Sequence, residues 1–414
     1  MKIIDIEVIP ISLPLSSRYD HAAGRLRMYD IDQQVAVKIH TDAGITGHGS
    51  YEDRPDIAPS EIEPLIDTNP FDHLHNDYNL GIGMALYDVM GKYLEVPAYK
   101  LMGRKVRDAA PVAAWTRPCA PDVFAAEVAR AVEQGYRIFK MHTDPRFDVI
   151  EQTKAAEQVA PPGFRIHWDM NHSRTSSVVL PLIAELEKHS IVGFIEDPLP
   201  WTDIEGWRAL RAKSRVPLVM HNPQLGGIQE VMHGCADVYM VGGGIGKVLE
   251  HGFAYAKANA QVLIQQSGTA LMRALSLHEA AVLPTASAHL ITLDDQFEED
   301  IVSPGIPVTG GFCRVPEAPG LGVEIDEAAL QRASEREPLA RHEFIGIVHL
   351  PDERRLYTLD DGRRSVSGSN ALPRILGIEE GDLKGIRFEA WEPDGSERYA
   401  TLRARIQDEG IVIE

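Results

Sequence analysis

Short apolar runs recur along the middle of the chain at a nearly constant spacing. Six of them end near residues 142, 171, 197, 222, 241 and 266, in steps of 29, 26, 25, 19 and 25 residues. Each step has room for a strand, a helix and two loops, which is what parallel strands need to connect. With PVAAW (111–115) as the first strand and AHLITLDD (288–295) as the last, the pattern predicts a TIM-type (β/α)8 barrel. The 19-residue step indicates either a shortened helix or a misplaced strand.

The segments outside this rhythm have other periodicities. Residues 1–50 alternate like strands, and residues 58–106 carry apolar positions at helical spacing, as in MALYDVMGKYLEV. GVEIDEAALQRA (322–333) predicts a short helix. Beyond it come five strand-like runs, FIGIVHL, RRLYTL, GIRFEAW, ERYATLRARI and GIVIE, which predict an appended β-rich module. We assign residues 1–110 to an N-terminal α+β domain, 111–318 to the barrel, 319–341 to a return segment and 342–414 to a C-terminal β-rich extension.

Composition narrows the class of partner. The 414 residues are 44% hydrophobic and 25% charged, as in an ordinary globular protein, and the net charge of −20 argues against nucleic acid or an anionic membrane as the main partner. The three cysteines form no Cys-x-x-Cys pair, so neither a thiolate metal site nor a disulfide framework is expected. No signal-peptide pattern and no apolar run of membrane-spanning length occurs, which predicts a cytoplasmic location.

Candidate chemistry stands at the ends of the predicted barrel strands, where such barrels carry their active sites. Asp169 and Glu196 end neighbouring strands, and two adjacent carboxylates repel each other unless a proton or cation lies between them. An oxygen-liganded Mg²⁺ would resolve this, whereas the alternative is a pair of solvated strand-end residues. Lys140 and His142 share one face of their strand and suit proton transfer, since a nearby cation can lower the pKa of a lysine.

The polar segment SSRYDHAAGRLRMYD (16–30) has two readings. It is either a solvated connection or a lid over the site, in which case Tyr19 and His21 would contact the substrate. The strand that ends in His221 and Asn222 raises a second question, because an imidazole and an amide stand there where the preceding strand ends in carboxylates.

Several motifs taken together resemble the enolase superfamily, in its mandelate racemase and muconate lactonising enzyme branch. They are VKIHTDAGITGHG (37–49), MALYDVMGKYLEVPAYKLMG (84–103), FKMH, HWDMN, GFIEDPLP (193–200), SLHEAAVLP (276–284) and VPEAPGLGVEID (315–326). The resemblance covers roughly residues 1–335. It implies a capping domain built from the N-terminal residues and the return segment, and a modified barrel that binds Mg²⁺. It also implies abstraction of a proton next to a carboxylate, with the metal stabilising the enediolate.

Carried over residue by residue, the resemblance assigns roles to the strand-end side chains. Asp169 and Glu196 match the first two metal ligands, and Asn222 falls at the third, with His221 as the alternative. Lys140 and His142 occupy the positions of the family's two strand-two lysines and would be the catalytic residues. The remaining polar strand-end residues, Asn171 and Gln265, would bind substrate.

The departures from the family pattern bear on the reaction. The strand-six aspartate and the strand-eight glutamate have no match, and Gln265 replaces the strand-seven histidine. An amide does not titrate, so proton transfer is expected from one side only. This favours an acid-sugar dehydratase over a racemase. The alternatives are a diverged barrel that binds a carboxylate without turnover, or a site rebuilt around histidines and another metal. The expected partners are a small-molecule carboxylate and, from the resemblance, other copies of the chain in a homo-oligomer.

Overall fold

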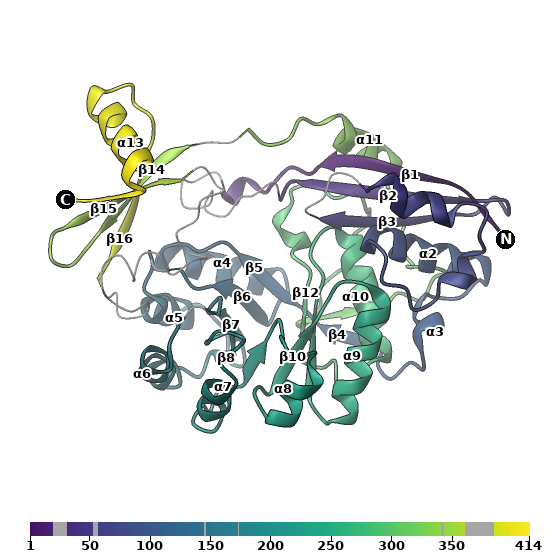
Figure 1. Cartoon of the computed structure of the whole chain (residues 1–414), viewed down its shortest axis with the longest axis horizontal. Helices are drawn as coiled ribbons and strands as arrows, with labels where there is room; N and C mark the ends of the chain where they lie inside the picture. The colour runs from purple at the N-terminus through teal and green to yellow at the C-terminus, as the bar shows by residue number, and fades with distance from the viewer. Residues whose placement is uncertain (20–30, 53–56, 145, 173, 341–342, 361–384) are drawn as a thin grey trace.

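The computed structural model describes residues 1–19, 31–52, 57–144, 146–172, 174–340, 343–360 and 385–414. A barrel occupies the middle of the molecule, with the N-terminal sheet at one end and a small C-terminal module at the other (Figure 1). The fold class predicted from the sequence is confirmed in all three parts. The boundaries between the domains stay predictions.

Eight parallel strands form the barrel in chain order. Val112 forms a parallel bridge with Leu290, which joins the first strand region to the last and closes the sheet. Apolar side chains such as Val219, Leu263 and Ile291 fill the interior, so the barrel is a packed core. The strands are β5 (Ala113–Thr116), β6 (Ile138–His142), β7 (Arg165–Asp169), β8 (Val192–Glu196), β9 (Leu218–Met220), β10 (Val238–Val241), β11 (Gln261–Gln265) and β12 (Leu290–Ile291).

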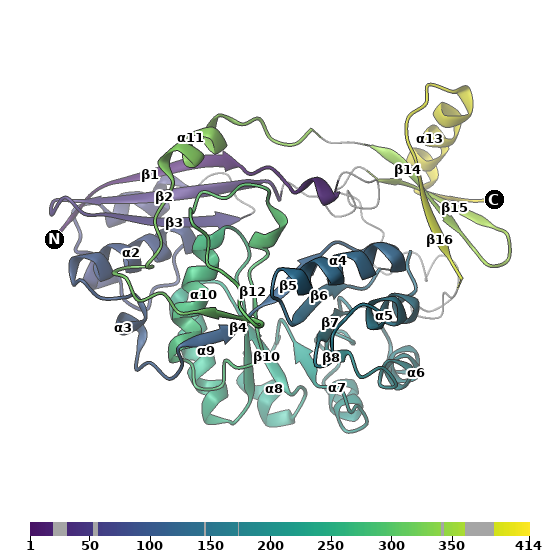
Figure 2. The same ribbon diagram turned by 180° about the vertical axis from the view of Figure 1, so that it is seen from behind.

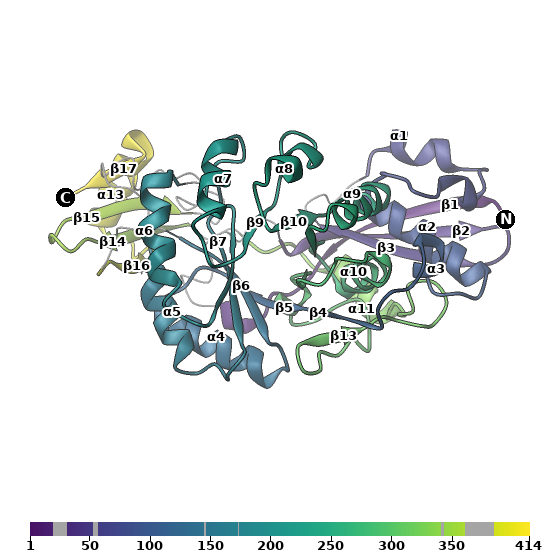
Figure 3. The ribbon, with the colours of Figure 1, turned by 90° about the horizontal axis from the view of Figure 1, so that it is seen from below.

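Seven helices connect these strands and surround the sheet (Figure 3). Their starts follow capping rules: the Asp148 carboxylate accepts from the amides of Ile150 and Glu151, and Thr269 accepts from that of Leu271. The 19-residue step holds a helix of only six residues, so the shortened-helix reading is confirmed. The helices are α4 (Pro121–Glu133), α5 (Val149–Glu157), α6 (Ser176–Leu186), α7 (Ile204–Arg211), α8 (Ile228–His233), α9 (Ile245–Lys257) and α10 (Ala270–Val282).

The N-terminal sheet packs on a buried helix. Strands β1 (Ile3–Ser12), β2 (Gln33–Thr41) and β3 (Thr46–Glu52) pair antiparallel, and α2 (Leu80–Tyr93) lies directly under them. A Cβ at Gly49 would come within 2.0 Å of the carbonyl oxygen of Gly81, so this close approach needs glycine. The shorter elements are η1 (Ser17–Tyr19), α1 (Pro59–Ile62), η3 (Glu63–Leu65), η4 (Pro70–His73) and α3 (Tyr99–Met102).

The chain returns to the N-terminal domain after the barrel. The last barrel strand is followed by the 3-10 helix η5 (Asp294–Gln296), and β13 (Phe312–Arg314) then pairs with β4 (Ala109–Pro111). The helix α11 (Glu327–Glu335) lies against β1 on the outside of the N-terminal sheet (Figure 2). Lys38 on β2 binds Glu327 at 2.7 Å and holds α11 in place.

The C-terminal module is a four-stranded antiparallel sheet covered by one helix. Its strands β14 (Phe344–His349), β15 (Arg355–Asp360), β16 (Arg387–Trp391) and β17 (Ile411–Ile413) lie in the order β16-β14-β15-β17. The strand predicted at ERYATLRARI is wrong, because these residues lie in α13 (Glu397–Glu409). Tyr399, Leu402 and Ile406 recur at helical spacing and are buried against the sheet, and the Ser396 hydroxyl caps the helix start.

Two negative findings concern the part of the chain that the structure describes. None of its helices combines the length and apolar character needed to cross a bilayer. All three cysteines, Cys119, Cys235 and Cys313, are buried and free, in agreement with the expectation that no disulfide framework exists.

Candidate active site

The carboxyl ends of β6, β7 and β8 bring Lys140, Asp169 and Glu196 together. Asp169 lies directly opposite Glu196 in the strand register. The Lys140 Nζ is 3.1 Å from Asp169 Oδ2, 2.9 Å from Glu196 Oε2 and 3.2 Å from Gln265 Oε1, which accounts for all three of its N–H groups. Only 1% of Lys140 is exposed, so the ammonium is a buried cation between two buried carboxylates.

Mutual attraction keeps these three groups charged. Burial alone would lower the pKa of Lys140, but Glu196 and Asp169 raise it above the usual lysine value. Burial likewise opposes ionisation of Glu196, yet Lys140 and the hydrogen bonds from His167 and His221 hold its pKa well below the ordinary range. The expectation that a nearby cation lowers the pKa of Lys140 concerns the site with a metal bound, and it stays a prediction.

His142 is oriented by two acceptors. Its Nδ1 is 3.0 Å from Asp169 Oδ2 and 3.0 Å from Asn171 Oδ1. Because a carboxylate only accepts, Nδ1 must carry the hydrogen, and Nε2 is left with its lone pair available for a proton. The Trp115 ring meets the imidazole edge to face at 6.3 Å. The arrangement is that of a histidine general base steered by a carboxylate.

Glu196 is the most heavily contacted residue of the site. Its Oε2 is 2.9 Å from His167 Nε2 and its Oε1 is 3.1 Å from His221 Nδ1. Of the two residues that end the fifth barrel strand region, His221 is thus the one against Glu196. Asn222 is exposed, and its backbone carbonyl accepts from Gln224. The role of Asn222 as a ligand stays a prediction.

The donor atoms present fit a divalent cation. Glu196, Asp197 and His221 each offer a ligand atom within 4.8 Å of the other two, and Asp169 adds a carboxylate from the neighbouring strand. Oxygen ligands suit Mg²⁺, and the imidazole also suits Mn²⁺, Fe²⁺ or Zn²⁺. Burial and the charges of Glu196 and Asp169 raise the pKa of Asp197 to about 8, while its Oδ1 accepts from the His221 amide at 3.0 Å.

The short segments that directly follow β10 and β11 carry no ionisable side chain of their own. The residues that follow these strands, 242–244 and 266–269, are glycines, a glutamine, a serine and a threonine. Gln265 uses its amide oxygen to accept from Lys140, and the Gln266 amide donates to Glu279 in α10 at 2.6 Å. The glycines after β10 connect it to α9.

Tyr19 is linked to the site through the Arg117 guanidinium and the Trp115 ring. It is buried in η1, and the Arg117 guanidinium lies 5.4 Å from its ring and 5.4 Å from that of Trp115, which in turn contacts His142. The described residues therefore connect Tyr19 to His142 indirectly. His21 and most of the proposed lid lie outside the described residues.

His167 is a site residue that the sequence reasoning missed. It is buried two positions before Asp169, so strand alternation already places both side chains on one face. Its Nδ1 is 2.9 Å from His289 Nε2, which extends the polar network into the barrel interior. The signal was present in HWDMN, but a lone histidine at a buried strand position is usually structural.

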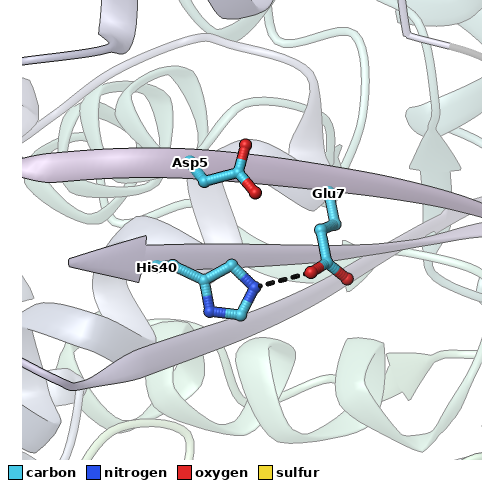
Figure 4. A group of neighbouring side chains, drawn as sticks. All are labelled: Asp5, Glu7 and His40. Atoms are coloured by element: carbon cyan, nitrogen blue, oxygen red, sulfur yellow. Dashed lines mark hydrogen bonds and ion pairs between the residues drawn. The ribbon is translucent and has the colours of Figure 1, made fainter.

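Other polar features lie away from this rim. Asp5, Glu7 and His40 form an exposed group on the N-terminal sheet, where His40 binds Glu7 at 3.1 Å (Figure 4). A cavity of 510 Å³ opens next to Val216 and Pro217, which precede β9, and so lies at the opposite end of the barrel from the strand-end residues. Neither feature contributes to the site at the carboxyl ends of the strands.

Comparison with known proteins identifies the family of the chain. A family model described as enolase C-terminal domain-like matches residues 123–329, half of the chain. The N-succinyl-L-Arg/Lys racemase of Bacillus cereus is 26% identical over 383 residues, covering 82% of this chain and 100% of that protein. The D-xylonate dehydratase of Haloferax volcanii is 27% identical over 410 residues, covering 80% and 93%.

Solved structures share the fold. The mandelate racemase/muconate lactonizing family protein of Azoarcus sp. EbN1 has a TM-score of 0.66 at 23% identity, covering 82% of this chain and 99% of that one. The family match, the relatives and the shared architecture lead to one conclusion: the chain belongs to the enolase superfamily, in its mandelate racemase and muconate lactonizing enzyme branch.

Proposed function

We propose that this protein is a dehydratase of a hydroxylated carboxylate, of the acid-sugar kind. The observation that carries the proposal is the one-sided rim. His142, with Nδ1 bound to Asp169 and Asn171, offers a base on the β6 side, whereas residues 242–244 and 266–269, which follow β10 and β11 in the described chain, carry only amide, hydroxyl or glycine side chains. A racemase needs proton transfer on both faces of the carbon, but a syn-elimination needs it on one.

The steps follow from the position of His142. Its Nε2 takes the proton from the carbon next to the carboxylate and then returns a proton to the hydroxyl on the following carbon. That C–O bond breaks, the hydroxyl leaves as water, and the remaining enol tautomerises to a 2-keto acid. Lys140 holds Asp169 and Glu196 in place through its ammonium. Gln265 and Asn171 support Lys140 and His142, and their contact with substrate belongs to the proposal.

A divalent cation held by Asp169, Glu196 and His221, or Asn222 in its place, would neutralise the charge that develops on the substrate carboxylate. The naming of D-xylonate and D-gluconate dehydratases among the relatives supports the same substrate class. The homo-oligomeric state and the cytoplasmic location remain proposals that rest on the family resemblance and on the sequence.

The test is a screen of sugar acids for the release of 2-keto-3-deoxy acids, with Mg²⁺ and Mn²⁺ supplied separately. We expect turnover by the native chain and a loss of about 10²- to 10⁴-fold in kcat for His142→Asn. The control is His233→Asn, an exposed histidine at the end of α8. Inversion at the carbon next to the carboxylate without water loss, which turns a sugar acid into its epimer, would establish a racemase or epimerase instead. Saturable binding without turnover would establish a diverged binding protein.

A further inference from the structure

The C-terminal module touches the barrel at the loop that follows His142. This 143–148 loop, of which the structure describes residues 143, 144 and 146–148, connects β6 to α5. The module lies on the α5 side of the barrel in two views (Figures 1 and 3). Arg146 donates from NH2 to Asp360 Oδ2 at 3.0 Å, across 214 positions of sequence. The Phe388 ring lies 5.4 Å from the Arg146 guanidinium and meets Phe147 edge to face at 6.0 Å.

The Arg146–Asp360 pair is buried rather than a surface contact. Both residues are 1% exposed, and the Arg146 NH1 also lies 3.6 Å from Asp144 Oδ2. A buried guanidinium is tolerated only with a partner, and removing one member of such a pair leaves an uncompensated charge. Docking of the module and the conformation of the loop therefore depend on each other.

Hydrogen bonds link the 143–148 loop to the residues that hold His142, the proposed base. The Thr143 amide donates to the carbonyl of Asp169 at 2.8 Å, and its carbonyl accepts from the Asn171 side chain at 3.5 Å. Asp169 and Asn171 are the two residues that hold the His142 Nδ1. The Arg146 amide donates to Asp144 Oδ1 at 2.9 Å, so the path from the module to the imidazole is Asp360, Arg146, Asp144, Thr143 and Asn171.

We propose that the C-terminal module is a working part of the active site, in which Arg146 and Asp360 are positioning residues that hold the 143–148 loop and thereby His142. The inference rests on the proposed function for its kinetic consequence, but the structural coupling is independent of it. The family match ends at residue 329, before the module begins.

The first test needs no substrate. Hydrogen–deuterium exchange is compared between the native chain and the variants Asp360→Asn and Phe388→Leu. The amides of Thr143, Arg146 and Phe147 are all hydrogen-bonded, so their protection reports the loop. We expect faster exchange in residues 143–148 for both variants. The matched control is Asp352→Asn, which removes an exposed pair with Arg354 in the same module. Unchanged exchange in the loop would overturn the proposal, whether or not any acid is turned over.

The second test separates positioning from a loss of folded enzyme. With a substrate deuterated at the carbon next to the carboxylate, Asp360→Asn should lower kcat by about tenfold or more and raise the kinetic isotope effect, because a misplaced base slows proton abstraction itself. A smaller folded fraction would lower kcat and leave the isotope effect unchanged. Asp360→Glu, which keeps the charge, should recover part of the rate. An isotope effect equal to that of the native chain would contradict the positioning role.

Discussion

On the β6–β8 side of the barrel, Lys140 and Glu196 hold each other charged, whereas burial favours the neutral forms of Glu279 and His278 in α10. Lys140 and Glu196 attract each other at 2.9 Å, and each shifts the pKa of the other toward the charged form. Glu279 has only the Gln266 amide as a hydrogen-bond partner among the described residues, and burial raises its pKa well above the ordinary value. Burial likewise lowers the pKa of His278 to about 4.

The difference shows what decides the state of a buried acid or base. The side chains compared here are all fully buried or nearly so, and burial therefore opposes the charged form of each to a similar degree. They are Lys140, Glu196, Glu279 and His278. Opposite charges within hydrogen-bonding reach offset that cost for Lys140 and Glu196. Among the described residues no such charge is bonded to Glu279 or His278, so the neutral form is favoured there. Charge is thus concentrated where the proposed chemistry needs it.

The largest expected loss of stability comes from removing Lys140 from its two buried carboxylates. Lys140→Met leaves Asp169 and Glu196 without their shared cation, and we expect the free energy of unfolding to fall by about 3–5 kcal/mol in buffer that contains a chelator. Urea unfolding measures it. Lys154→Met, which removes an exposed pair with Glu151, should change the free energy of unfolding very little, because water screens that pair. Equal losses for the two variants would show that burial of Lys140 does not matter.

Glu279→Gln should raise the free energy of unfolding instead of lowering it. The folded state keeps a proton on Glu279 that the unfolded chain releases above its ordinary pKa, so native stability falls as the pH rises. Glutamine cannot ionise, and its advantage over the native residue should grow from acidic to neutral pH by about 1.4 kcal/mol per unit. Unfolding midpoints between pH 5 and pH 8 test this. Glu196→Gln, the matching change at the strand ends, should destabilise the folded state over this whole pH range, because Lys140 then loses the negative charge of its partner.

His278 should make the free energy of unfolding depend on pH to a smaller extent, and at acidic pH. Its folded pKa of about 4 lies below the value of an exposed histidine near 6.5. The unfolded chain therefore binds a proton that the folded chain refuses, and stability falls as the pH drops from about 6.5 toward 4. His278→Gln should flatten this slope, whereas His233→Gln, at an exposed position, should leave it unchanged. Part of the slope should persist in His278→Gln, because burial also lowers the pKa values of His167 and His289. A slope equal to that of the native chain would assign the whole dependence to other groups.

The periodic apolar runs were enough to predict the barrel, because strand and helix periods are local properties of the sequence. The same locality explains the error at ERYATLRARI, where alternation and helical spacing coexist over ten residues and packing against the module sheet selects the helix. Asp169 and Glu196 were found by their place at strand ends. His167 was not identified as a site residue, because no local pattern distinguishes a buried histidine that contacts a site carboxylate from one that only packs in the core.

The sequence by itself determined the order of the strands, the carboxylates at their ends and the missing base on the β11 side, since each depends on residue type and on position within one strand. Only the tertiary structure decided that His221 rather than Asn222 lies against Glu196, that Lys140 is saturated by three acceptors, and that Asp360 meets Arg146. These contacts join residues up to 214 positions apart, and their distances follow from how whole elements pack, which no local pattern encodes.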